Sequence, residues 1–140
     1  MRKQSGFSLL EVMVVLVIIG MIMSIVAPNI MGQKEEADLD KAHLDIQQIE
    51  DALNMYKLRV NTYPTTEQGL EALVTKTSIE PIPKRFPEGG FINELPLDPW
   101  GNPYQLIYPG EIGKIDVFSM GPDGEAGTED DIGNWDEEER

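Results

Sequence analysis

The sequence predicts an α+β fold in which one long N-terminal α-helix packs on a small antiparallel β-sheet. Three observations predict it: an apolar run near the start, a helical spacing of apolar residues after that run, and two short alternating segments further on. The chain has 140 residues, so the part that follows the apolar run suffices for one small domain with one core.

The apolar run extends from Phe7 to Ala27 and forms the first part of the predicted helix. As a helix it reaches about 32 Å, enough to cross a bilayer core of about 30 Å. Because the run is longer than the core of a secretory signal, we expect residues 7–27 to be retained as a transmembrane helix. Arg2 and Lys3 precede the run, so the positive-inside rule places that end in the cytoplasm and the rest across the membrane.

Glu11 is a carboxylate inside this apolar run. An ionised side chain at the centre of a membrane helix costs roughly 2.5 to 3.5 kcal/mol on insertion scales, so such a residue is a functional candidate whose partner has to be found. The partner that we expect is an amine, because opposite charges at close range offset part of their desolvation.

The helix is predicted to continue beyond the apolar run. Apolar residues there recur at spacings of 4, 3, 4 and 3, which places them on one helix face: Ala42, Ile46, Ile49, Leu53 and Tyr56. We expect a single helix from Phe7 to about Arg59 that is interrupted at Pro28 and Gly32. Pro28 lacks a backbone donor, so this stretch should kink.

Short elements are predicted after the helix. Thr65 should cap a short helix over Glu67 to Val74, and a proline-rich loop follows it. Residues 104–108 and 115–119 alternate apolar and polar side chains and should form two strands of a hairpin that packs on the amphipathic helix.

Composition excludes several function classes. The chain has no cysteine, so disulfides and thiolate chemistry are impossible. It carries 25 acidic against 11 basic residues, a net charge of −14, which argues against nucleic acid and anionic lipid as ligands of the part outside the membrane. His43 is its one histidine, and no nucleophile can be paired with a base, so we expect no enzyme.

A glycine-rich loop over residues 120–131 is the candidate cation site. Its carboxylates recur with small residues between them, and calcium takes six to eight oxygens from carboxylates and backbone carbonyls. The spacing differs from that of an EF-hand. Composition alone leaves open a second interpretation, a disordered acidic loop that leads into the acidic tail.

The leader, Lys3-Gln4-Ser5-Gly6-Phe7-Ser8-Leu9-Leu10-Glu11, resembles the class III signal of type IV pilins and type II secretion pseudopilins. The resemblance implies that a prepilin peptidase cuts after Gly6, which makes residues 1–6 a cleaved leader, and methylates the new amine of Phe7. It also implies that Glu11 places one subunit against the next. A neighbour's amine would meet Glu11 if the two helices were staggered by about 6 Å. The alternatives are pairing with its own amine and snorkelling to the interface.

The body of the chain is similar to one branch of that family, the major pseudopilin of type II secretion. The similar segments are residues 63–66, 68–73, 98–102 and 131–135. The resemblance implies a type IV pilin-like fold, with residues 28–140 as a periplasmic domain on a single-pass anchor in the bacterial inner membrane. It implies a homo-oligomeric helical filament that drives protein export through the outer membrane, with minor pseudopilins and the inner-membrane secretion platform as partners.

The same resemblance implies one calcium ion in the loop 120–131. Side-chain oxygens would come from Asp123, Asp130 and Asp131, and backbone carbonyls from Met120, Glu125 and Thr128.

Two other functions stay open at this point. A type IV pilin of a surface fibre would share the leader, but such pilins commonly close their C-terminal region with a disulfide, and this chain has no cysteine. A membrane-anchored calcium-binding module that never polymerises would also fit the composition. Crosslinking in membranes would distinguish this module, since it predicts no ladder of multimers.

Overall fold

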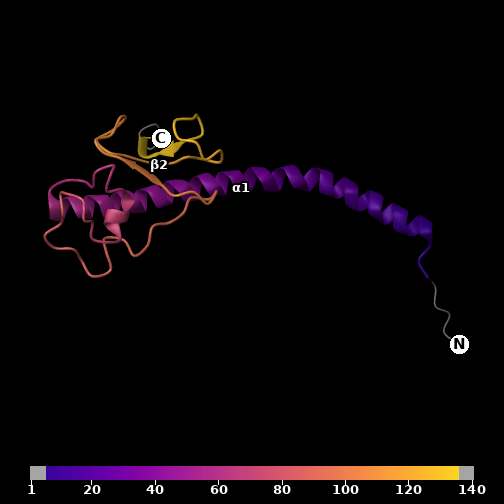
Figure 1. Cartoon of the computed structure of the whole chain (residues 1–140). Coiled ribbons are helices and arrows are strands. Elements are labelled where there is room, and N and C mark those ends of the chain that lie inside the picture. Colours follow the sequence, from indigo (N-terminus) through magenta and orange to yellow (C-terminus); the bar gives the residue numbers. More distant parts are fainter. Residues whose placement is uncertain (1–5, 136–140) are drawn as a thin grey trace. The chain divides into compact units, whose positions relative to one another are not determined.

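The computed structural model describes residues 6–135, except for the side chains of residues 26–31. The elements, in chain order, are α1 (Leu9–Val60), the 3₁₀ helix η1 (Leu70–Leu73), β1 (Gln105–Ile107), β2 (Asp116–Ser119) and β3 (Ile132–Gly133) (Figure 1). The chain divides into two compact units, Met1–Ala37 and Asp38–Arg140.

In the first unit, α1 begins two residues later than predicted, because Ser8 caps it. The backbone N–H of Glu11 donates to the Ser8 hydroxyl at 3.2 Å, and the N–H of Val12 donates to the Ser8 carbonyl at 3.2 Å. This is the hydrogen-bonding pattern of an N-cap serine. Within the described part of the chain, no helix combines the length and the apolarity that a membrane crossing requires.

Two predictions fall outside the description. Residues 1–5 hold the basic leader, and the kink expected at Pro28 depends on a side chain among residues 26–31. Both therefore stay predictions. The expected interruption of the helix at Pro28 and Gly32 is wrong, because α1 continues without a break from Leu9 to Val60.

The predicted apolar stripe is the centre of the core in the second unit. Each of its five residues is at most 1% exposed: Ala42, Ile46, Ile49, Leu53 and Tyr56. Leu106, Val117 and Ile132, one from each strand, belong to the same buried cluster. The prediction that the hairpin packs on the amphipathic part of α1 is therefore confirmed.

The helix predicted over Glu67 to Val74 is wrong in extent. Thr65 and Gln68 form the reciprocal bonds of a capping box: the Gln68 N–H donates to the Thr65 hydroxyl at 3.2 Å, and the Thr65 N–H donates to the Gln68 side-chain carbonyl at 2.9 Å. Gly69 then turns the backbone to a φ of 63°, which an α-helix does not allow. The helical turn that remains, η1, has four residues.

The sheet has three antiparallel strands in the order β1-β2-β3. Leu106 pairs with Val117 in the predicted hairpin, and Phe118 pairs with Gly133 of β3. The sequence did not predict β3, which is two residues long. All four residues of β2 are buried, since this central strand is covered on both faces, and the ring of Phe118 packs on Trp135 with 5.7 Å between centroids.

Leu53→Ala should lower the free energy of unfolding by about 2 to 5 kcal/mol, because it leaves a cavity in the core. Leu58→Ala is the matched control and should change it by less than about 0.5 kcal/mol, since Leu58 is 84% exposed whereas Leu53 is 0% exposed. Urea unfolding of the chain in detergent, followed by tryptophan fluorescence, measures both. Equal losses for the two variants would contradict this core.

Candidate functional sites

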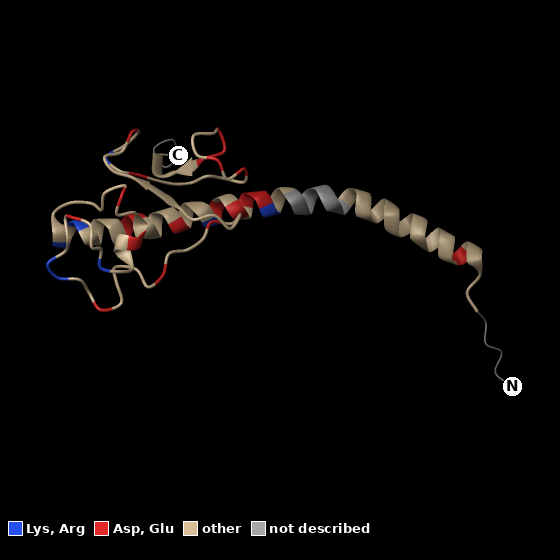
Figure 2. Cartoon of the chain, in the orientation of Figure 1, with Lys and Arg blue, Asp and Glu red and all other residues tan. Residues whose placement is uncertain are grey.

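The first candidate site is the start of α1. Gly6, Phe7 and Ser8 precede the helix in non-helical, exposed backbone, and Glu11 lies in the first helical turn. Glu11 is the one charged residue between Leu9 and Ile25 (Figure 2). A carboxylate in the first turn is favoured by the helix dipole.

The Glu11 carboxylate has no hydrogen bond or ion pair to another residue in the stretch 6–135, and its side chain is exposed. The predicted pairing with an amine requires the N-terminus of a processed chain. The roles assigned to Gly6, Phe7 and Glu11 therefore stay predictions, and the geometry leaves the Glu11 side chain accessible for such a partner.

The second candidate site is the acidic loop of residues 120–131, which joins β2 to β3 (Figure 2). The loop closes on itself at Gly121, which has a φ of 63°. A Cβ at this position would collide with the backbone carbonyl of Asp130. Glycine is required here both by its conformation and by the close approach of the two ends of the loop.

Asp130 is held by two donors from the loop. The Thr128 hydroxyl donates to Oδ1 at 2.6 Å, and the backbone N–H of Asp123 donates to Oδ2 at 3.3 Å. The Thr128 bond is the main cause of a lowered pKa of Asp130. Hydrogen bonds to the charged form of a carboxyl group stabilise it, so Asp130 is an anion at neutral pH.

The other two aspartates of the predicted calcium site are also tied to the loop backbone. Asp123 Oδ1 accepts the N–H of Glu125 at 2.8 Å, and Asp131 Oδ2 accepts the N–H of Gly127 at 2.7 Å. The second oxygen of Asp131, Oδ1, is buried without a hydrogen-bond partner among the described residues. A buried acceptor left in this way costs free energy, which a bound cation would remove.

The donor chemistry of this loop fits calcium, since carboxylates, a hydroxyl and backbone carbonyls are all oxygen ligands. The Thr128 hydroxyl oxygen also lies 3.1 Å from the Glu125 carbonyl oxygen, so residues 125 and 128 lie close together. No group of three or more acidic or histidine side chains in residues 6–135 is arranged as a metal site. The chain thus brings the predicted ligands into one loop without forming a complete carboxylate cluster.

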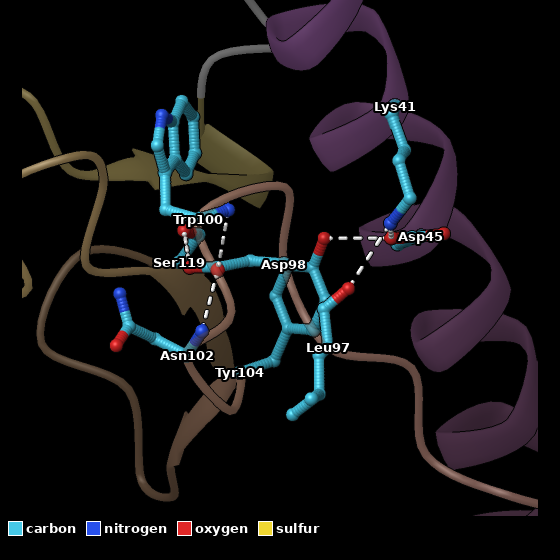
Figure 3. Close-up of polar contacts among 8 residues, drawn as sticks. All are labelled: Lys41, Asp45, Leu97, Asp98, Trp100, Asn102, Tyr104 and Ser119. Atoms are coloured by element: carbon cyan, nitrogen blue, oxygen red, sulfur yellow. Dashed lines mark hydrogen bonds and ion pairs between the residues drawn. The ribbon is translucent and has the colours of Figure 1, made fainter.

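A buried polar network beside the acidic loop was missed by sequence reasoning, which named residues 98–102 only as a segment that resembles the major pseudopilin. Asp98 accepts the N–H groups of Trp100 at 3.0 Å and Asn102 at 2.7 Å, and the Ser119 hydroxyl at 2.6 Å (Figure 3). An Asp that precedes Pro-Trp-Gly-Asn is a signal for a side-chain-closed turn. Nothing local to the sequence indicates Ser119 as the third partner.

Leu97, the residue before Asp98, connects this turn to α1. Lys41 Nζ lies 2.6 Å from Asp45 Oδ2 and donates to the Leu97 carbonyl at 3.0 Å (Figure 3). The Tyr104 hydroxyl donates to Asp45 Oδ2 at 2.8 Å. Burial, then the hydrogen bond and charge of Asp45, raise the pKa of Tyr104 well above its usual value near 10.

The raised pKa of Tyr104 predicts a pH dependence of stability. An unfolded tyrosine ionises near pH 10, whereas the folded state keeps this proton to higher pH. The contribution of Tyr104 is therefore fully present below about pH 10 and is lost as the pH rises further. In Tyr104→Phe, the free energy of unfolding should fall less steeply above about pH 10, as measured by urea unfolding between pH 8 and 11. The same slope in both proteins would contradict the assignment.

A long N-terminal helix that is apolar at its start and amphipathic after it, packed there on a small antiparallel sheet, defines a pilin-like protein. Residues 1–27 match the family model described as the prokaryotic N-terminal methylation motif. Residues 29–135 match the model described as type II secretion system (T2SS), protein G. The chain belongs to this protein G family.

Individual relatives agree with the family. The chain is 64% identical over 134 residues to the type II secretion system core protein G of Aeromonas hydrophila, covering 96% of this chain and 94% of the relative. It is 59% identical over 138 residues to the protein of the same name from Vibrio cholerae, covering 96% and 94%.

A solved structure has the same fold. The crystal structure of the major pseudopilin from the type 2 secretion system of enterohaemorrhagic Escherichia coli matches with a TM-score of 0.72 and 53% identity, over 76% of this chain and 89% of that one. The predicted type IV pilin-like fold is therefore confirmed. The chain is a structural pseudopilin subunit of the type II secretion system.

Proposed function

We propose that this chain polymerises into the periplasmic pseudopilus and that the filament drives protein export through the outer membrane. The observation that carries the proposal is the exposed apolar start of α1. Every large apolar side chain described from Phe7 to Ile25 is 45% to 83% exposed. An apolar surface of this extent has to be covered by lipid or by other subunits. In a filament subunit, lipid covers it before assembly and other subunits cover it afterwards.

Before assembly, the chain is a precursor in the bacterial inner membrane. Residues 7–27 form its single membrane-spanning helix, and residues 28–140 are its periplasmic domain. The apolar run with two preceding basic residues supports this orientation. The membrane holds the subunit with its apolar surface covered until it enters the filament.

Processing creates the assembly site. Prepilin peptidase cuts after Gly6 and methylates the amine of Phe7. The methylation-motif match and the exposed, non-helical backbone around Gly6 support this step. The new amine of one subunit then pairs with Glu11 of its neighbour, since each charge in an apolar setting lowers the desolvation cost of the other.

Calcium fixes the acidic loop of the folded domain. Asp123, Asp130 and Asp131 supply side-chain oxygens, and Met120, Glu125 and Thr128 supply carbonyls. This assignment is supported by the all-oxygen donor set, by the anionic Asp130 and by the Oδ1 of Asp131, which has no hydrogen-bond partner within residues 6–135. The ion supplies positive charge to a loop whose carboxylates would otherwise repel one another.

The role of the chain is mechanical and does not include catalysis. Its partners are further copies of itself, the minor pseudopilins and the inner-membrane secretion platform. The acidic domain gives no surface for nucleic acid, since the net charge is −14.

Deletion of the gene for this chain tests the proposal. Exported substrates of type II secretion should accumulate in the periplasm, and the wild-type chain should restore export whereas a chain that lacks residues 7–27 should not. Intact export together with the loss of a surface fibre would replace this function with that of a type IV pilin.

A further inference from the structure

Asp98 is a buried carboxylate with a complete set of partners. It is 4% exposed and lies in the turn before β1. Its Oδ1 accepts two backbone N–H groups of that turn, so one oxygen suffices to close the turn. Its Oδ2 is directed to another element, the end of β2, where Ser119 lies (Figure 3).

Ser119 connects this carboxylate to the acidic loop. The side chain is 0% exposed, and its hydroxyl donates to Asp98 Oδ2 at 2.6 Å. The same hydroxyl oxygen accepts the backbone N–H of Gly121 at 3.1 Å. A hydroxyl bond of this length to a carboxylate is charge-assisted and about twice as strong as a neutral one. The direction of the Ser119 hydroxyl is thus fixed, and its lone pair points to Gly121.

Gly121 transmits this constraint to Asp130. Its backbone lies so close to Asp130 that an added Cβ would be 2.8 Å from Asp130 Oδ2 and would collide with the Asp130 carbonyl. A displacement of Gly121 toward Asp130 therefore has to move Asp130, and a displacement away from it removes this close contact. The position of the Asp130 carboxylate then depends on a hydrogen-bond chain anchored outside the loop.

We propose that Asp98 and Ser119 are positioning residues for the acidic loop: their buried hydrogen bonds hold Gly121 against Asp130 and so set where the carboxylates that take calcium lie. Neither residue is itself a ligand. The inference rests on the proposed calcium binding, and it adds that the affinity of the loop is determined in part by the turn at residues 98–102.

A purely structural role for the network makes a different prediction. If Ser119 only stabilised the fold, its removal would lower stability equally with calcium and with chelator. If Ser119 positions the loop, its removal lowers the calcium affinity as well, because the cost of ordering the loop then offsets part of the free energy of calcium binding. The calcium dissociation constant separates the two roles, and stability in chelator does not.

The test measures calcium binding to the full chain in detergent by isothermal titration, for wild type and Ser119→Ala. The control is Thr66→Val, which removes a hydroxyl that also bridges a backbone donor and acceptor, both of Tyr108 and remote in sequence from the acidic loop. Ser119→Ala should raise the dissociation constant at least tenfold, equivalent to about 1.4 kcal/mol. Thr66→Val should leave it within about twofold.

Asp98→Asn serves as the second variant, in case Ser119→Ala does not fold in chelator. Its side-chain carbonyl can still accept both N–H groups of the turn, but the amide that replaces Oδ2 cannot accept the Ser119 hydroxyl. It should also raise the dissociation constant. Wild-type affinity in the folded variants would overturn the positioning role and leave calcium binding intact. Absence of calcium binding by the wild type would overturn both.

Discussion

Glu11→Lys abolishes filament assembly and leaves the second unit folded: this is the largest effect that we expect. The substitution puts a second positive charge where the amine of the neighbouring Phe7 would lie, so an attractive pair becomes a repulsive one in a medium of low dielectric. Glu11 belongs to the first unit and takes no part in the buried core. Electron microscopy of filaments from cells that overproduce the chain measures assembly.

Glu36→Lys is the matched control, since it reverses the charge of another exposed acid on α1 outside the apolar run. It should assemble like the wild type. Tryptophan fluorescence of both variants should show the same unfolding transition, because the two tryptophans lie in the second unit. Normal filaments from Glu11→Lys would contradict the pairing of Glu11 with the amine of the neighbouring Phe7, although the chain would remain a pseudopilin.

The second large effect concerns calcium. Calcium at 100 times its dissociation constant should stabilise the wild-type chain by about 2.7 kcal/mol, and magnesium should not, because it favours smaller octahedral sites that retain water. Asp123→Ala should lose this stabilisation, since it removes a predicted ligand. Asp123 is exposed and lies outside the buried core, so the fold itself should be retained. Thermal unfolding with calcium, magnesium or chelator measures the stabilisation.

Glu94→Ala is the control for that experiment, because it deletes an exposed acid of the same unit outside the acidic loop. It should keep the full response to calcium. No response in the wild type would make the loop a solvated acidic segment. That result would remove the metal site and strengthen the alternative of a type IV pilin fibre.

Local and periodic features of this fold were readable from the sequence. The five predicted residues of the stripe from Ala42 to Tyr56 are all buried, because burying one face of a helix requires a fixed spacing. Ala52, which is buried beside them, was not predicted. The hairpin of β1 and β2 was predicted because two alternating segments close in sequence pair readily. The Ser8 cap was missed, although Ser8 and Glu11 have the spacing of a capping box.

Features that depend on distant contacts were not readable. β3 has two residues and forms because it pairs with the edge of β2. The short extent of η1 was missed for a local reason, since Gly69 departs from helical geometry. The acidic loop was identified by composition. The contact between Ser119 and Asp98 joins residues 21 apart, so no periodicity marks it.

The most direct test of polymerisation is crosslinking in membranes. The chain has no cysteine, so a cysteine-specific reagent reacts only with cysteines introduced by substitution. A stagger that brings Phe7 of one subunit to Glu11 of the next also brings residue 10 to residue 14. Chains with Leu10→Cys and chains with Val14→Cys, produced together in the same cells and treated with a short bismaleimide, should therefore give a crosslinked dimer that neither variant gives alone. Separate chains are needed because residues 10 and 14 of one helix are close enough to be bridged within one subunit. The same pair with Glu11→Lys should give monomers. Monomers alone from the two variants produced together would contradict assembly and leave a membrane-anchored module that does not polymerise.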